Sequence, residues 1–142
     1  MTTARAQMVI RRSVHDVFES FADPEVTTRF WFTKSTGRLE PGAHVEWTWE
    51  MYDAHAQVDV KDVEPDRRIL IQWDGYGTTP VEFLFTPRKD GATFVEITNS
   101  DITSCEDAIS STQGFTCVLA GLKALLEHDI ELNLVADHHP AD

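Results

Sequence analysis

Large aromatic side chains, and not an obvious catalytic motif, are the most prominent chemistry-bearing feature of this sequence. Trp47 and Trp49 alternate with polar residues, and Trp73, Phe83 and Phe85 follow the same two-residue period further along the chain. This period predicts strands with one apolar face. Such a face can line a cavity for a flat apolar molecule, which indole N–H groups would orient, or it can fill a core. The candidate ligand-binding residues are Trp31, Trp47, Trp49, Trp73, Phe83, Phe85, Phe115 and Leu119.

Acidic side chains occupy the alternate positions of the same predicted strands. Paired carboxylates can act as general acid and base when their environments separate their pKa values. The alternation nevertheless places these carboxylates on the outer, solvated face of the sheet, where we expect no catalytic pair. The residues concerned are Glu46, Glu50, Asp59, Glu82 and Glu96. Polar groups expected inside a pocket are instead Tyr52, His55, Tyr76 and Thr112, because loops and the first half of a helix would flank an entrance.

The six histidines and two cysteines show no metal-binding or nucleophile motif. No two histidines have the H-x-x-x-H or H-E-x-x-H spacing, and neither cysteine has an identifiable histidine partner. Cys105 and Cys117, if both lie in one helix, are about 18 Å apart, far beyond the roughly 7 Å limit for a disulfide. Free thiols are typical of a reducing compartment. We therefore expect no metal, no cofactor and a cytoplasmic location.

Turn and cap residues divide the first third of the chain. Residues 7–12 predict a first strand, after which Ser13 can cap a short helix whose apolar stripe includes Val17 and Phe21. Asp23 and Pro24 restart the pattern, because a capping Asp followed by Pro is typical of a helix start. The chain therefore begins with a strand and two short helices.

The middle of the chain predicts a meandering antiparallel sheet of about six short strands, with one face buried. Its first hairpin has an apolar face that includes Trp49 and Met51, and the glycine-rich segment DGYGTTP is predicted to form a loop at a pocket rim. From residue 104 or 105 the period becomes 3.6, which predicts a helix of about 25–30 residues whose apolar stripe extends from Ile109 to Ile130. Gly114 and Gly121 either weaken this helix or mark close packing.

This order of elements resembles the helix-grip fold of the START-like (SRPBCC) superfamily, and in particular the branch named after the activator of the heat-shock protein 90 ATPase. The segments that carry the resemblance are SVHDVFESFADPEVTTRFW, GRLEPGAHVEW, VKDVEPDRRILIQW, VEFLFTPRKDGATFVEITNS and QGFTCVLAGLKALLE. Phe115 stands where a tryptophan is usual in that branch. The expected fold class is α+β, a curved antiparallel sheet with two short helices after the first strand and a long C-terminal helix over a cavity.

The resemblance implies that the protein binds a small apolar or aromatic molecule in a cavity between the sheet and the last helix. Two other functions stay open. One is an enzyme of the cyclase, aromatase or hydrolase kind that uses the same cavity. The other is a protein-interaction module that regulates a chaperone. START-like domains often dimerise, so a homodimer is also open.

Composition limits the partners of this chain. Its 142 residues predict a single domain, residues 1–142, with residues 136–142 as a frayed tail. Twenty-four acidic and twelve basic side chains give a formal charge of −12, which disfavours nucleic acid and anionic lipid. The apolar runs are shorter than the ~20 residues of a membrane span, so no membrane insertion is expected.

Overall fold

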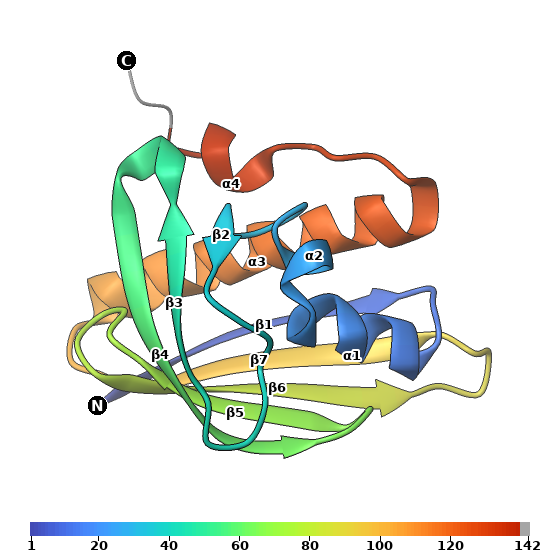
Figure 1. The fold of residues 1–142 in the computed structure, drawn as a ribbon, viewed down its shortest axis with the longest axis horizontal. Helices are drawn as coiled ribbons and strands as arrows, with labels where there is room; N and C mark the ends of the chain where they lie inside the picture. The colour runs from blue at the N-terminus through green and yellow to red at the C-terminus, as the bar shows by residue number, and fades with distance from the viewer. Residues whose placement is uncertain (140–142) are drawn as a thin grey trace.

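A seven-stranded antiparallel sheet and one long helix make up most of the structure, a computed structural model that describes residues 1–139. The spatial order of the strands is β1-β7-β6-β5-β4-β3-β2. The strands are β1 (Thr2–Ile10), β2 (Lys34–Ser35), β3 (His44–Trp49), β4 (Ala54–Glu64), β5 (Arg68–Trp73), β6 (Thr79–Pro87) and β7 (Thr93–Ile102). Figure 1 shows the sheet curving around α3 (Cys105–His128), which lies across it. The predicted α+β helix-grip fold is confirmed.

The two short helices begin where their capping residues predict. α1 (Val14–Ala22) starts after Ser13, whose Oγ accepts a hydrogen bond from the Asp16 amide at 3.2 Å. α2 (Pro24–Thr27) follows Asp23, whose carboxylate accepts from the Glu25 amide at 3.0 Å. Each cap satisfies an amide that the first helical turn leaves unpaired. Both helices pack on the same side of the sheet as α3 (Figure 1).

Alternate residues of the central strands point into one continuous core, as their two-residue period predicts. The buried apolar residues of these strands are Val45, Trp47, Val58, Val60, Ile69, Ile71, Trp73, Val81, Phe83, Phe85, Val95 and Ile97. The first strand begins at Thr2, five residues earlier than the expected position 7, and it pairs along its length with β7. This pairing joins the start of the chain to the last strand, beneath α3.

α3 has 24 residues, and its apolar stripe differs from the predicted one at both ends. The stripe runs from Ala108 through Phe115 and Leu119 to Leu125, which are all buried. Ile109 is 66% exposed because it follows Ala108 by one residue, about 100° around the helix. Ile130 lies beyond the helix, because Asp129 adopts a left-handed conformation that ends it. The prediction that both isoleucines belong to the buried stripe is wrong.

The end of the first hairpin also departs from the predicted strand. β3 stops at Trp49, and a 3₁₀ turn, η1 (Glu50–Tyr52), leads into Asp53, which has a φ of 50°. Trp49 and Met51 are therefore only half-buried, instead of lying on the covered face. The sheet is less completely covered at this end, and the cleft described in the next subsection lies here.

The chain after α3 folds back over this open end. α4 (Leu134–Asp137) lies near the turn between β3 and β4 in Figure 1. Residues 136–139, expected to fray, thus begin inside a helical turn, while 140–142 lie outside the described residues. By length and composition α3 would be apolar enough to cross a membrane, but here its apolar side packs against the sheet.

Candidate functional site

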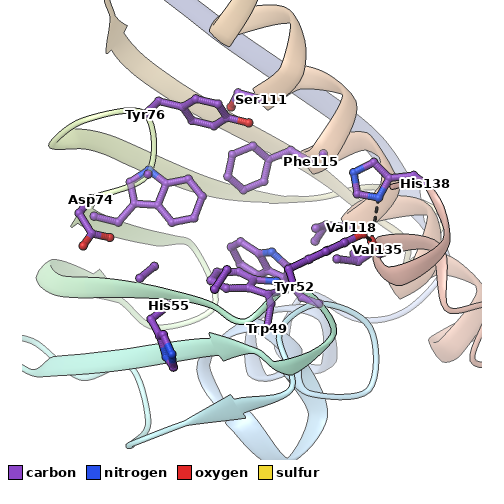
Figure 2. A pocket seen from close by; sticks show the side chains of 16 residues that line it. Trp49, Tyr52, His55, Asp74, Tyr76, Ser111, Phe115, Val118, Val135 and His138 are labelled. Carbon is purple, nitrogen blue, oxygen red and sulfur yellow. Dashed lines mark hydrogen bonds between the residues drawn. The ribbon is translucent and has the colours of Figure 1, made fainter. Parts of the chain in front are cut away.

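A cleft of about 260 Å³ opens between α3, α4, η1 and the loop that joins β5 to β6. Figure 2 shows Phe115 projecting from α3 into it, with Tyr76 and Asp74 on one side and Val135 and His138 on the other. The predicted cavity under the helix is thus an open cleft at one end of the sheet.

Four of the eight predicted ligand-binding residues form the wall and floor of the cleft, namely Trp31, Trp49, Trp73 and Phe115. The Phe115 ring centroid lies 5.6 Å from that of Trp31 and 5.7 Å from that of Trp73. These separations are typical of packed aromatic pairs, which hold one another in place. Trp31, Trp73 and Phe115 are buried, so the floor is a packed layer.

The other four predicted residues, Trp47, Phe83, Phe85 and Leu119, do not line the cleft. All four are buried in the filled core. Trp47 stacks on Phe32 with ring centroids 4.6 Å apart, and Phe83 lies 5.2 Å from Phe21. Strand alternation correctly predicts that they face inward, but it cannot tell a core position from a cleft wall further along the same face.

The polar lining agrees in part with the expected set. Tyr52, His55 and Tyr76 line the cleft, whereas Thr112 does not. Thr112 instead borders a separate depression near the start of β1, and Ser111, one residue earlier, lines the cleft. The ring of His55 points away from the centre of the cleft in Figure 2.

Sequence reasoning missed seven residues of the lining, namely Ala54, Ala56, Ser111, Gly114, Val118, Val135 and His138. The position of Ser111 four residues before Phe115 could have indicated a shared helix face. Asp74 belongs to the DGYGTTP loop, which lies at the rim as predicted. Nothing in the sequence indicates that His138 returns to the cleft.

Gly114 and Gly121 of α3 serve different purposes. A Cβ atom at Gly121 would contact Phe30 at 3.5–3.6 Å, so this glycine marks close packing. A Cβ atom at Gly114 would meet nothing within 4 Å, because that position faces the cleft. A third glycine, Gly75, is needed in the rim loop, since a Cβ atom there would lie 2.6 Å from the Trp73 indole.

A chain of buried hydrogen bonds connects the floor of the cleft to α3. The Trp73 indole N–H donates to Thr79 Oγ1 at 3.1 Å, and the Thr79 hydroxyl donates to the Gly75 carbonyl at 2.8 Å. The Asn99 amide donates to Thr79 Oγ1 at 2.9 Å, and the Ser111 hydroxyl donates to Asn99 Oδ1 at 3.0 Å. These bonds hold Trp73 and Ser111 at fixed positions.

Tyr52 connects η1 to α4 at the other side of the cleft. Its hydroxyl donates to the Val135 carbonyl and, at 3.1 Å, to the Ala136 carbonyl. Burial raises the pKa of the Tyr52 phenol above its ordinary value. His138 Nδ1 lies 2.8 Å from the Val135 carbonyl, drawn as a dashed line in Figure 2. The Tyr52 hydrogen bonds hold α4 against the cleft, whereas the His138 contact lies within the α4 segment itself.

The predicted carboxylates lie away from the cleft. Asp59 and Glu50 are exposed, and Glu46, Glu82 and Glu96 are half-buried at outward positions. Asp59 pairs with His44 at 2.7 Å, and this hydrogen bond raises the pKa of His44 and lowers that of Asp59. Within residues 1–139, no three histidine, cysteine or acidic side chains form a metal-binding group.

Comparison with known proteins gives one family and many similar folds. Residues 11–127 match the family model described as Activator of Hsp90 ATPase homolog 1-like protein. No curated protein gives a significant match. SSP2350 from Staphylococcus saprophyticus is 28% identical over 92% of this chain and 96% of its own, with a TM-score of 0.82.

Two less similar structures share the fold. The Aha1 dimer from Colwellia psychrerythraea has a TM-score of 0.80 at 16% identity, over 90% of this chain and 98% of that one. DynU16, a protein of the dynemicin biosynthetic locus, has a TM-score of 0.81 at 19% identity, over 91% of this chain. This chain spans 48% of DynU16.

Proposed function

This chain belongs to the Activator of Hsp90 ATPase homolog 1-like protein family, and we propose that it binds a small, largely apolar molecule in the cleft beside α3. The observation that carries the proposal is the aromatic floor of Trp31, Trp73 and Phe115, which Trp49 extends to the rim. Ligand sites are typically concave and mostly apolar, with a few placed polar groups.

The cleft has the size for a small ligand. Its volume of about 260 Å³ falls just below the roughly 300–1,000 Å³ of pockets that hold drug-sized ligands. Burial of apolar ligand surface contributes about 25 cal/mol for each Å² removed from water. Because the floor is already packed, binding would need little ordering of the aromatic side chains, which favours affinity.

The enzymatic alternative needs a cleft group that exchanges a proton near neutral pH. Tyr52 donates its proton to backbone carbonyls, and burial moves its pKa further from neutrality. Tyr52 therefore supports positioning of α4 better than acid–base chemistry. Of the two histidines in the lining, His55 points its ring away from the cleft centre and His138 bonds the Val135 carbonyl, so binding without catalysis is the function that this geometry supports best.

Two further parts of the proposal concern assembly and location. The dimer formed by the Colwellia protein supports a homodimer for this chain, which sedimentation equilibrium would measure. Cys105 and Cys117 are both free, which supports a reducing, cytoplasmic compartment.

Gly114 offers a direct test of the cleft, because a side chain there enters open space. We expect Gly114→Leu to fill the cleft and to weaken binding of 2-naphthol at least tenfold in isothermal titration calorimetry. Gly114→Ala is the matched control. It should keep binding and raise the free energy of unfolding by up to about 1 kcal/mol, since alanine is the better helix former.

The proposal fails if folded Gly114→Leu binds 2-naphthol as tightly as the parent protein does. It fails also if the parent protein binds no probe and native mass spectrometry of freshly purified protein finds no bound small molecule.

A further inference from the structure

We propose that the cleft selects a neutral aromatic molecule that carries a hydrogen-bond donor, such as a hydroxyl group, and rejects anions of the same shape. This inference rests on the proposed binding function and specifies its ligand class. It follows from the direction of the hydrogen bonds around the cleft and from the charge of its rim.

The orientation of the Asn99 side chain determines the direction of the buried chain. The Asn99 amide nitrogen lies 3.0 Å from the Pro80 carbonyl, which can only accept a hydrogen bond. The NH₂ group therefore points to Pro80 and Thr79, and Oδ1 points to Ser111. Since Oδ1 can only accept, the Ser111 hydroxyl must donate to it. The lone pairs of Ser111 are what this residue can offer a ligand.

Two groups on the opposite side of the cleft also donate their protons to protein carbonyls, which leaves them as hydrogen-bond acceptors. Tyr52 donates its only proton to the carbonyls of α4, so its oxygen can accept but not donate further. His138 directs Nδ1 to the Val135 carbonyl, which makes Nδ1 the protonated nitrogen. In the neutral ring Nε2 is then an acceptor.

The rim adds negative charge without a compensating cation. Asp74 lines the cleft, and one of its oxygens accepts from the Gln57 amide at 3.0 Å. No lysine or arginine is among the described residues that line the cleft. In a chain of net charge −12, a ligand carboxylate would meet repulsion and no lysine or arginine partner in the cleft lining.

The aromatic floor does not cancel this preference. The Trp73 indole N–H is already bonded to Thr79. Trp31 and Trp49 also line the cleft, and a ligand hydroxyl can accept a bond from an indole N–H while donating its own proton. An ether oxygen can accept but cannot donate. A hydroxyl therefore satisfies more of the lining than an ether of the same ring.

Three probes with one ring system test the inference by isothermal titration calorimetry on the full chain. They are 2-naphthol, its ether 2-methoxynaphthalene, and 2-naphthoate. We expect 2-naphthol to bind roughly 3- to 10-fold more tightly than the ether, the effect of one additional hydrogen bond. We expect 2-naphthoate to bind at least tenfold more weakly than 2-naphthol.

Asp74→Asn separates rim charge from overall charge. Asparagine keeps an oxygen for the Gln57 amide but removes the charge. The difference in affinity between 2-naphthol and 2-naphthoate should therefore shrink several-fold. Asp101→Asn is the control, since Asp101 lies outside the cleft lining and the substitution changes the net charge equally. Its left-handed backbone also suits asparagine.

The outcomes distinguish this inference from the proposed function. If the ether or 2-naphthoate binds as tightly as 2-naphthol, the selectivity is overturned while binding in the cleft stands. If Asp101→Asn strengthens the binding of 2-naphthoate as much as Asp74→Asn does, the role of the rim carboxylate is overturned. If none of the three probes binds, the inference is contradicted. The proposed function is contradicted as well when native mass spectrometry of freshly purified protein also finds no bound small molecule.

Discussion

At the scale of single residues, buried polar groups fix the position of the cleft wall. Thr79, Asn99 and Ser111 are each at most 1% exposed, and they satisfy one another through hydrogen bonds. A buried polar group that loses its partner costs its desolvation energy. The stability of the protein and the position of Ser111 are therefore coupled through Asn99.

Ser111→Ala tests this coupling. The change leaves Asn99 Oδ1 buried without its donor, so we expect the free energy of unfolding to fall by about 1–3 kcal/mol. Urea denaturation measures it. Ser110→Ala is the same substitution one residue earlier, at an exposed position, and should change stability by less than about 0.5 kcal/mol. Equal effects of the two changes would contradict a structural role for the Asn99 bond.

No sequence pattern reveals the bonds among Thr79, Asn99 and Ser111, because these residues come from β6, β7 and α3 and lie twelve or more residues apart. The caps are different. Ser13 and Asp23 bond amides two or three residues away, so residue type and spacing alone predict them. Local chemistry could be predicted at this scale, and long-range pairing could not.

At the scale of elements, periodicity predicts orientation well in the middle of an element and poorly at its ends. Val58, Ile71 and Val81 lie in the middle of strands and are completely buried, as alternation predicts. Trp49 lies at the end of a strand, where no neighbouring element covers it fully, and this coverage depends on tertiary packing that a single segment does not contain. Ile109 lies in the first turns of α3, where the buried residue is Ala108, so the predicted stripe lies on the wrong face there.

α4 is the element whose position the sequence indicates least, and Tyr52 is what holds it. Tyr52→Phe removes the hydrogen bonds to the Val135 and Ala136 carbonyls, so α4 should open more often. We expect amide hydrogen exchange of residues 134–138 to accelerate several-fold, with little change in α3. Mass spectrometry of peptides resolves the two segments.

Tyr76→Phe is the matched control for this experiment. Tyr76 also lines the cleft, but its hydroxyl pairs with Ser110 at 3.0 Å instead of with α4. Exchange in residues 134–138 should then remain as in the parent protein. Unchanged exchange in Tyr52→Phe would show that α4 is held by apolar contacts alone.

At the scale of the whole molecule, one sheet face serves two purposes along its length. The part nearest α1 is filled, with Phe85 5.8 Å from both Phe18 and Phe21. The part near η1 and α4 is not filled, because the chain turns away at Trp49 and α3 carries Gly114 there. The fold class could be predicted from the order of elements, whereas the boundary between core and cleft depends on how all of them pack.

This division predicts that substitutions along the same face separate stability from binding. Phe83 is 1% exposed within the core, so Phe83→Ala should lower the free energy of unfolding by about 3–5 kcal/mol. Trp49 is half-buried at the cleft, so Trp49→Ala should lower the free energy of unfolding by only about 1–2 kcal/mol. Relative to this smaller loss of stability, it should weaken the binding of 2-naphthol more than Phe83→Ala does. Urea denaturation and calorimetry on the same samples measure both quantities. If Trp49→Ala instead destabilises as much as Phe83→Ala and leaves binding intact, the aromatic residues form one core and the cleft has no ligand-binding wall.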